Sequence, residues 1–282
     1  MKITSKHNPH FKSALKLKAS RGRRRSARFV IYGWREIQIA LRSPLATSIV
    51  ELFYCSEILD ASQWRELEAA ANRLPARLLE LERPLFEQLA FGDRLDGVVA
   101  VAESDVRGLD RLVVPDDGLV VVVESLEKPG NLGAVARVCD GGRVAALIAA
   151  SPRADFFHPY AIRASLGAVF TLPVATADTE GVVTWLQSHR FQVRIATPRP
   201  DAVPYFDSDL TGKLAIVLGA ESQGLSEVWF QSGAQPVRLP MCGQVDSLNI
   251  STAAAVLVYD ALRQRELQAQ RDRGQDSFLG KG

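Results

Sequence analysis

The chain has 282 residues, of which 47% are hydrophobic and 23% charged, and its formal net charge is +2. This length accommodates two domains, and so large an apolar fraction supports packed cores and excludes wholesale disorder. The sequence lacks the roughly 18 consecutive apolar residues of a membrane span and the apolar stretch of a secretory signal, so we expect a cytoplasmic protein with no membrane partner.

The first 28 residues form a basic arm. They hold ten Lys or Arg and no acidic residue, which leaves 24 of the 34 basic residues against all 32 acidic ones in the remainder. A basic segment on an acidic body favours a polyanionic partner such as structured RNA. The alternative is a solvated tail, but Asn8-Pro9 and the apolar residues after it predict a helix within the arm. The arm residues expected to bind RNA are Lys16, Lys18, Arg21, Arg23, Arg24 and Arg25.

Residues 1–104 alternate between helix and strand patterns, which predicts a small α/β domain. The expected elements are a helix from Asn8 to about Ala19, a basic turn Ser20–Arg25, a strand Ala27–Tyr32, a helix Trp34–Leu41, a strand Ile49–Cys55, a helix Ala61–Leu74, a helix Pro84–Phe91 and a strand Gly97–Ala102. The basic arm makes this domain the part that we expect to contact a polyanion.

Residues 105–117 are charged and broken by Gly108 and Pro115, so we predict a linker there. The strand Leu119–Glu124 that follows is apolar up to its last residue, as in a parallel sheet buried on both faces. The later expected elements are a helix after Pro129, a strand Ala145–Ala150, a helix around His158–Leu166, an apolar run Phe170–Val174, a helix Thr179–Arg190, strands Phe191–Ala196 and Leu214–Gly219, an apolar run Pro236–Met241 and a long helix after Asn249. This predicts a second α/β domain over residues 118–268 and a flexible tail over 269–282.

Several common kinds of site are not indicated. Cys55, Cys139 and Cys242 are isolated and lack CxxC spacing, which argues against a disulfide framework and against a zinc site. The four histidines offer no set of three ligands, so we expect no metal. The sequence also lacks the glycine-rich nucleotide signatures, the GxSxG elbow and the HExxH pair.

Three polar clusters each follow a predicted strand. They contain Asn131 with Arg137, then Glu221 between Gly219 and Gly224, and finally the stretch Ser247–Ser251. Because ligands of parallel sheets bind at the carboxyl ends of the strands, we expect these clusters to form one site. The alternatives are that Asn131, Ser247 and Asn249 only cap helices and that Glu221 only pairs with Arg137.

The clusters resemble the three motifs of the SpoU/TrmH family of RNA ribose 2′-O-methyltransferases. The first motif corresponds to Asn131-Leu132-Gly133-Ala134-Val135-Ala136-Arg137, the second to Val217-Leu218-Gly219-Ala220-Glu221-Ser222-Gln223-Gly224-Leu225, and the third to Leu239-Pro240-Met241 with Ser247-Leu248-Asn249-Ile250-Ser251. A further family-like stretch is Ile162-Arg163-Ala164-Ser165-Leu166-Gly167. The N-terminal part resembles more loosely the small RNA-binding domain that precedes the catalytic domain in relatives.

The resemblance implies an α/β domain with a trefoil knot, a homodimer, and methyl transfer from S-adenosylmethionine to structured RNA, ribosomal RNA rather than transfer RNA. By carry-over, the catalytic residues are Asn131, Arg137, Glu221 and Asn249, and the cofactor-binding residues are Thr197, Leu218, Gly219, Ala220, Leu239, Pro240, Met241, Ser247, Leu248 and Asn249. Arg137 and Arg163 are also expected to bind RNA. The alternative function is a non-catalytic RNA-binding or ribosome-assembly factor on this scaffold.

The chain departs from the family pattern at two positions. Tyr32 replaces an acidic residue that usually precedes Gly33, and Arg143 stands where relatives usually carry a glycine. Before Arg143, Gly141 and Gly142 weaken the predicted helix end by roughly 1 kcal/mol each relative to alanine. The departures leave the residues of the first motif intact but single out the backbone around Arg143.

Overall fold

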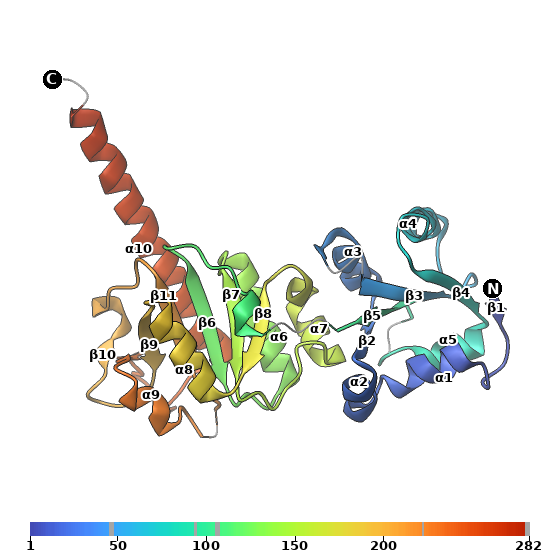
Figure 1. Ribbon diagram of the computed structural model, residues 1–282, viewed down its shortest axis with the longest axis horizontal. Coiled ribbons are helices and arrows are strands. Elements are labelled where there is room, and N and C mark those ends of the chain that lie inside the picture. The colour runs from blue at the N-terminus through green and yellow to red at the C-terminus, as the bar shows by residue number, and fades with distance from the viewer. Residues whose placement is uncertain (45–47, 93–94, 105–107, 222, 280–282) are drawn as a thin grey trace. The chain divides into compact units, whose positions relative to one another are not determined.

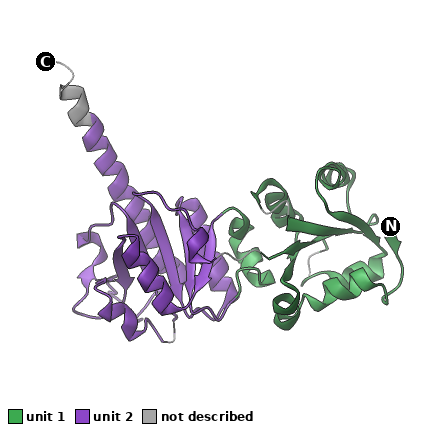
Figure 2. Ribbon diagram, in the orientation of Figure 1, with its two compact units in different colours: residues 1–105, 155–171 green, residues 106–154, 172–282 purple. Residues whose placement is uncertain are grey.

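The computed structural model describes residues 1–44, 48–92, 95–104, 108–221 and 223–279 (Figure 1). Residues 105–107 of the predicted linker, Ser222 of the second motif and residues 280–282 of the predicted tail lie outside this range. The chain divides into two compact units, one of residues 1–105 with 155–171, the other of residues 106–154 with 172–282 (Figure 2). The units therefore do not follow one another along the sequence, since residues 155–171 group with the N-terminal part.

The first unit contains a mixed five-stranded sheet in the order β1-β4-β3-β5-β2. Its strands are β1 (Lys2–Ile3), β2 (Arg28–Tyr32), β3 (Ile49–Tyr54), β4 (Arg77–Leu81) and β5 (Val98–Glu103), and its helices are α1 (Pro9–Lys16), α2 (Ser20–Ser26), α3 (Trp34–Arg42), α4 (Ala61–Ala71), α5 (Arg83–Leu89) and α7 (Pro159–Ser165). β4 is parallel to β1 and β3, whereas β5 is antiparallel to β2 and β3. The sequence analysis missed β1 and β4, which are short and lie side by side.

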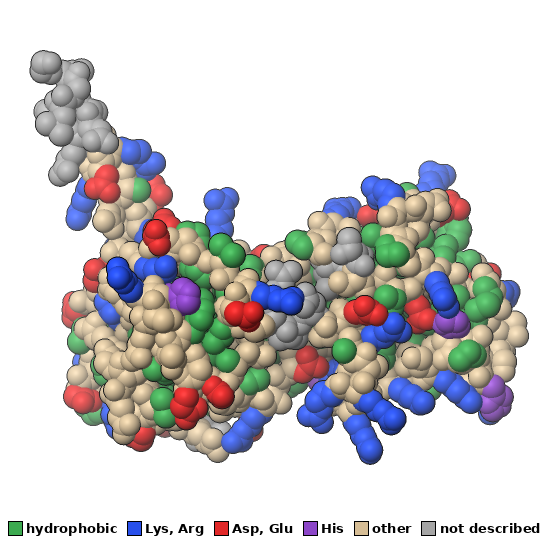
Figure 3. All heavy atoms as spheres, viewed as in Figure 1, with side chains coloured by type: hydrophobic (Ala, Val, Ile, Leu, Met, Phe, Trp, Pro, Cys, Tyr) green, Lys and Arg blue, Asp and Glu red, His purple; other side chains and the backbone are tan. Residues whose placement is uncertain are grey.

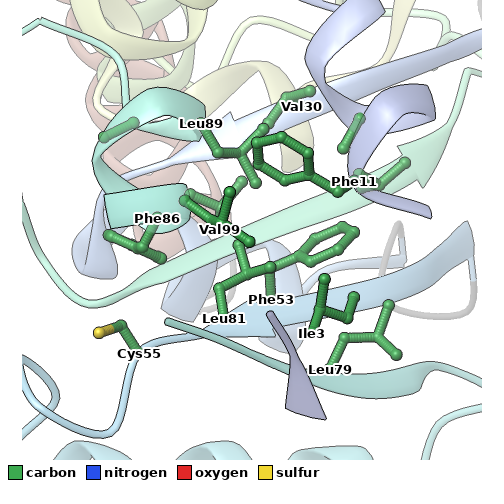
Figure 4. Packing of buried hydrophobic residues seen from close by; sticks show 14 of the residues in the cluster. Ile3, Phe11, Val30, Phe53, Cys55, Leu79, Leu81, Phe86, Leu89 and Val99 are labelled. Carbon is green, nitrogen blue, oxygen red and sulfur yellow. The ribbon is translucent and has the colours of Figure 1, made fainter. Parts of the chain in front are cut away.

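The basic arm is folded into this unit by apolar anchors. The side chain of Asn8 accepts hydrogen bonds from the backbone N–H groups of His10 and Phe11 and so caps α1, as predicted. Phe11 and Leu17 are 1% and 2% exposed and join the core beside β3, α5 and β5 (Figure 4). The segment expected to be a basic turn is the helix α2, which ends at Ala27 with a left-handed φ of 50°.

The second unit contains a seven-stranded sheet in the order β10-β12-β9-β11-β6-β7-β8, with every pairing parallel. Its strands are β6 (Leu119–Glu124), β7 (Ala146–Ala150), β8 (Val174–Ala177), β9 (Gln192–Ala196), β10 (Val203–Pro204), β11 (Leu214–Leu218) and β12 (Gln235–Arg238), and its helices are α6 (Pro129–Gly141), α8 (Thr179–Ser188), α9 (Glu227–Gln231) and α10 (Ile250–Leu279). All residues of β6 and β11 are buried, as their apolar sequences predict. The apolar run Phe170–Val174 extends from the end of a 3₁₀ turn, Ala168–Phe170, to the first residue of β8, Val174.

The last helix, α10, packs against α6 at Gly141 and Gly142. A Cβ added to Gly142 would lie 2.4 Å from Cγ1 of Val258, so this position allows α10 to approach α6 closely. α10 continues through Leu279 and carries helical structure into the range 269–282, where composition predicts a flexible tail. Neither α10 nor any other helix of the described ranges is long and apolar enough to cross a membrane.

A Schellman motif ends α6, with Arg143 in its left-handed position. The N–H of Val144 donates to the carbonyl of Cys139 at 2.9 Å and the N–H of Arg143 to that of Asp140 at 3.1 Å. Arg143 has a φ of +48°, a conformation in which a Cβ is strained and which glycine adopts freely. The position where relatives carry glycine is therefore one that requires a positive φ.

We expect Arg143→Gly to stabilise the protein. Removing the strained Cβ outweighs the greater freedom of glycine in the unfolded chain, for a net gain of about 0.5 to 1 kcal/mol. Gly142→Ala is expected to lower stability, because its Cβ would overlap Val258. Urea unfolding of both variants measures these changes, and equal or lower stability of Arg143→Gly would contradict the strain argument.

Candidate active site

A cavity of about 380 Å³ opens in the second unit where three neighbouring parallel strands end. Its walls come from the loops after β9, β11 and β12, with the first residues of α10 closing one side. The lining residues are Ala196, Thr197, Pro198, Leu218, Gly219, Ala220, Glu221, Gln223, Gly224, Leu239, Met241, Asp246, Ser247, Leu248, Ile250 and Ala253. The volume and the largely apolar lining with a few polar groups are typical of a small-molecule site.

Most of the residues predicted to bind the cofactor lie together in this cavity. Eight of them line it, whereas Pro240 and Asn249 are not among the lining residues. The sequence analysis did not single out Asp246, whose acidic side chain lies beside the third motif. Its place directly before Ser247-Leu248-Asn249 is the signal that could have identified it.

The second motif forms a tight turn that depends on two glycines. The N–H of Gly224 donates to the carbonyl of Ala220 at 2.8 Å, and the two residues form an isolated antiparallel bridge. A Cβ on Gly219 would lie 2.3 Å from the carbonyl carbon of Gly224, and Gly224 itself has a φ of +66°. Only glycine fits both conditions without moving the backbone, so these residues bring the turn back over the end of β11.

Glu221, at the tip of this turn, collects polar groups from all three motifs. Its Oε1 accepts hydrogen bonds from Nδ2 of Asn131 at 3.0 Å and from Nδ2 of Asn249 at 2.9 Å. Its Oε2 lies 3.2 Å from Nζ of Lys128. The carboxylate therefore joins the start of α6, the turn after β11 and the segment before α10.

Asn131 and Asn249 differ in whether they cap a helix. The N-cap of α6 is Lys128, and Asn131 lies inside the first turn with its side chain on Glu221, so the capping interpretation of Asn131 is wrong. Asn249 has both roles, because its Oδ1 accepts from the backbone N–H and the hydroxyl of Ser251 while its Nδ2 donates to Glu221. The predicted pairing of Glu221 with Arg137 is also wrong, since Lys128 is its basic partner.

Arg137 is exposed on α6, and within the described ranges its side chain forms no hydrogen bond or ion pair. The structure thus does not join Arg137 directly to the cluster around Glu221. A guanidinium that is not engaged by the protein keeps its donors available for a carboxylate or phosphate of a ligand.

Glu124 is a buried supporting residue that carried no role in the sequence analysis. It ends β6 and is 3% exposed. Its carboxylate accepts hydrogen bonds of 2.8 Å from the hydroxyl of Thr179, from the hydroxyl of Ser226 and from the backbone N–H of Ser226. Because Ser226 lies just beyond the Glu221 turn, Glu124 fixes the downstream end of that turn.

The residues predicted to bind RNA are not all accessible. Lys16, Arg21, Arg24, Arg25 and Arg163 are exposed, and basic side chains gather over α2 in Figure 3. Lys18 is half-buried and donates to the carbonyl of Gln88 at 2.8 Å, and burial lowers the pKa of its ammonium group. Arg23 is 4% exposed, pairs with Asp155 at 3.1 Å and donates to the carbonyls of Leu17 and Lys18. The guanidinium of Arg23 is therefore used inside the first unit, and its contact with RNA stays a prediction.

The second unit is a parallel α/β fold with a cavity for a small molecule at its strand ends. The chain also carries the basic helix α2, whose exposed arginines suit a polyanion. Together these features define a class of protein that has both a small-molecule site and a basic surface. The family model of the SpoU rRNA Methylase family matches residues 118–259, and that of an MRM3-like substrate binding domain matches residues 8–100. The chain belongs to the SpoU rRNA methylase family, which confirms the predicted resemblance.

Three relatives illustrate the similarity. The chain is 31% identical to the 23S rRNA (uridine(2479)-2′-O)-methyltransferase of Streptomyces viridochromogenes, over 94% of this chain and 92% of the relative. It is 32% identical to a 23S rRNA (guanosine-2′-O-)-methyltransferase RlmB of a Burkholderia species, over 84% and 96%. The structure of the AdoMet-bound rRNA methyltransferase from Sinorhizobium meliloti superimposes with a TM-score of 0.84 at 26% identity, covering 93% of this chain and 97% of the other.

Gly219→Ala is expected to weaken the binding of S-adenosylhomocysteine in the cavity by at least about 10-fold. The added Cβ would overlap the backbone of Gly224, so the turn must move and carry Glu221 with it. Calorimetry with S-adenosylhomocysteine measures the loss. Gly243→Ala is the matched control, because a Cβ there meets nothing within 4 Å, and equal affinity of the two variants would contradict the role of the turn.

Proposed function

We propose that the protein transfers a methyl group from S-adenosylmethionine to a ribose 2′-hydroxyl of 23S ribosomal RNA. The observation that carries this proposal is the convergence of the three motifs at one place, with the cavity on one side of Glu221 and Asn131 and Asn249 bound to its carboxylate. The family membership and the two 23S rRNA ribose methyltransferases among the relatives support the same reaction.

The cavity fits a nucleoside thioether. Leu218, Leu239, Met241 and Leu248 offer apolar contacts for a ring system, while the loop backbone and Asp246 offer polar partners. Thr197, Gly219, Ala220 and Ser247 complete the proposed set of binding residues, and Pro240 shapes the third loop without lining the cavity. S-adenosylmethionine, when bound there, supplies a methyl group that is already activated by its sulfonium.

The side chains have to align the ribose and accommodate the charge of its oxygen. Glu221 holds the amide groups of Asn131 and Asn249 in fixed positions, so the polar groups do not have to reorganise when RNA arrives. We assign Arg137 to the RNA phosphate and to the negative charge that develops on the ribose oxygen as its proton passes to solvent. A guanidinium stays protonated in proteins, so it is suited to stabilise an anion and unsuited to act as the base.

Residues 1–104, which include the exposed cations of the arm, are proposed as the RNA substrate-binding part, and residues 118–268 as the catalytic part. The RNA contacts are assigned to Lys16, Lys18, Arg21, Arg24, Arg25, Arg137 and Arg163. We further propose a cytoplasmic homodimer with the trefoil knot that the family resemblance implies. β11 lies in the middle of the sheet, between β9 and β6, and α10 packs against α6. The C-terminal segment therefore returns to the centre of the unit, as the proposed knot requires.

The alternative function is a non-catalytic RNA-binding or assembly factor. It would bind RNA without a methyl donor, and the preserved cavity and polar cluster favour the enzyme. Incubation with labelled S-adenosylmethionine and unmodified ribosomal RNA, followed by digestion to nucleosides, is expected to yield 2′-O-methylated ribose. Donor affinity without any labelled ribose would overturn the proposed reaction.

Arg137→Gln is expected to reduce the rate of methyl transfer by a factor of about 10² to 10³, the usual loss when a group that stabilises a developing oxyanion is removed. Affinity for S-adenosylhomocysteine should stay unchanged, because Arg137 is not among the residues that line the cavity. Arg143→Gln, which alters another exposed arginine just beyond the same helix, is the control. Single-turnover rates and calorimetry measure both quantities, and equal rates for the two variants would contradict the assignment.

A further inference from the structure

An aromatic side chain stands exposed on α7 with two rings behind it. Tyr160 is 55% exposed, and its ring centroid lies 5.0 Å from that of Phe91 in an edge-to-face arrangement. The ring of His158 stacks against Tyr160 at 5.6 Å with an interplanar angle of 13°. All three residues belong to the first unit. They form what we call the aromatic step.

Tyr160 is not part of the core of that unit, whereas Phe91 packs against the core and stacks on Tyr32. The neighbouring rings of Phe157, Phe170 and Phe29 stack on one another and are buried, and they hold residues 155–171 to β2. Tyr160, on the same segment, supports none of this packing and keeps more than half of its surface in water. An exposed ring held in place by other rings is a ready-made stacking surface.

His158 is fixed in a form that suits stacking. Its Nδ1 accepts a hydrogen bond from the backbone N–H of Tyr160 at 3.2 Å, which fixes the orientation of the imidazole. Burial and the nearby charge of Arg23 lower the pKa of His158, although Asp155 opposes the shift. With Nδ1 as the acceptor, the ring carries its proton on Nε2 and presents an uncharged face.

Positive charge borders the step. Arg163 is exposed one helical turn after Tyr160, and its Nη1 lies 3.7 Å from the place that a Cβ of Gly92 would occupy, next to Phe91. The pair Arg23–Asp155 connects the segment before α7 to α2 and its exposed arginines. An exposed ring beside a guanidinium group, here that of Arg163, is a combination by which proteins bind single-stranded nucleic acid.

We propose that the aromatic step is a stacking site for an unpaired RNA base, with Arg163 bound to an adjoining phosphate. This inference rests on the proposed function, since it names the feature of the RNA that the first unit recognises. A paired base offers no free face, so the site selects loops, bulges or ends over continuous duplex. The cationic border favours RNA over an apolar protein surface as the occupant.

The test compares the binding of the full chain to two RNAs, a hairpin with an unpaired loop and the same stem closed into a continuous duplex. Tyr160→Ala is expected to weaken hairpin binding about 10-fold and to change duplex binding less than about two-fold. Tyr160→Phe should bind as the parent protein does, because the ring is retained. Arg163→Gln should lower the salt dependence of hairpin binding by about 0.7 in the log–log slope.

Phe206→Ala is the matched control, because Phe206 is 54% exposed and packs edge-to-face on Tyr205 with centroids 5.3 Å apart in the other unit. Tyr160→Leu, which keeps an apolar contact with Phe91 but lacks a ring, decides the matter if Tyr160→Ala does not fold. The proposal would be overturned if the Tyr160→Ala or Tyr160→Leu variant bound the hairpin as tightly as the control variant does. It would also be overturned if the substitution weakened the binding of hairpin and duplex equally. A change in sedimentation on substitution of Tyr160 would overturn it in favour of a protein contact.

The outcomes also separate this inference from the proposed function. Hairpin binding that depends on Tyr160 in a protein that transfers no methyl group would leave the aromatic step intact and remove the proposed reaction. Methyl transfer to RNA by a protein whose Tyr160→Ala variant binds the hairpin normally would remove the aromatic step alone.

Discussion

The carboxylate of Glu221 is the group on which the arrangement of the candidate site depends. Three donors from separate parts of the chain converge on its two oxygens, from Lys128 and Asn131 at the start of α6 and from Asn249 before α10. Each donor lies at or just before the first turn of a helix. Bound to one anion, the amide groups take fixed positions beside the cavity, and a preorganised polar group does not have to reorient when charge develops on a substrate.

The position of this carboxylate is in turn set by backbone constraints. Gly219 and Gly224 let the turn fold back on itself, and Glu124 binds Ser226 at its far end with two hydrogen bonds. Glu124 is buried but fully hydrogen-bonded, so its desolvation is compensated. Gly142 acts at greater distance, because the close approach of α10 to α6 places Asn249 and Asn131 within reach of the same oxygen. Packing and polar geometry are therefore coupled in this unit.

The basic residues of the arm fall into two groups, those that are bound inside the first unit and those that are exposed to solvent. Arg23 is enclosed between Asp155 and backbone carbonyls, and it orders the junction of α2 with residues 155–171. Its neighbours Arg21, Arg24 and Arg25 remain exposed because α2 turns them away from this junction. An apolar face of α1, with Phe11 and Leu17 in the core, supports the arm. The exposed cations of the arm are thus held by a folded scaffold.

The sequence by itself determined most of the longer helices and strands and the residues of the three motifs. Apolar runs such as Leu119–Glu124 became buried parallel strands, and the motif spacings identified Asn131, Glu221 and Asn249, because local composition and motif order are properties of the chain alone. It did not reveal β4, since a short strand depends on its neighbour β3 for pairing. Only the tertiary structure decided that residues 155–171 join the first unit, that Arg23 is buried while Arg24 is exposed, that Glu221 pairs with Lys128 instead of Arg137, and that Arg143 is left-handed. Each of these depends on contacts between residues distant in sequence or on backbone geometry, which residue types do not specify.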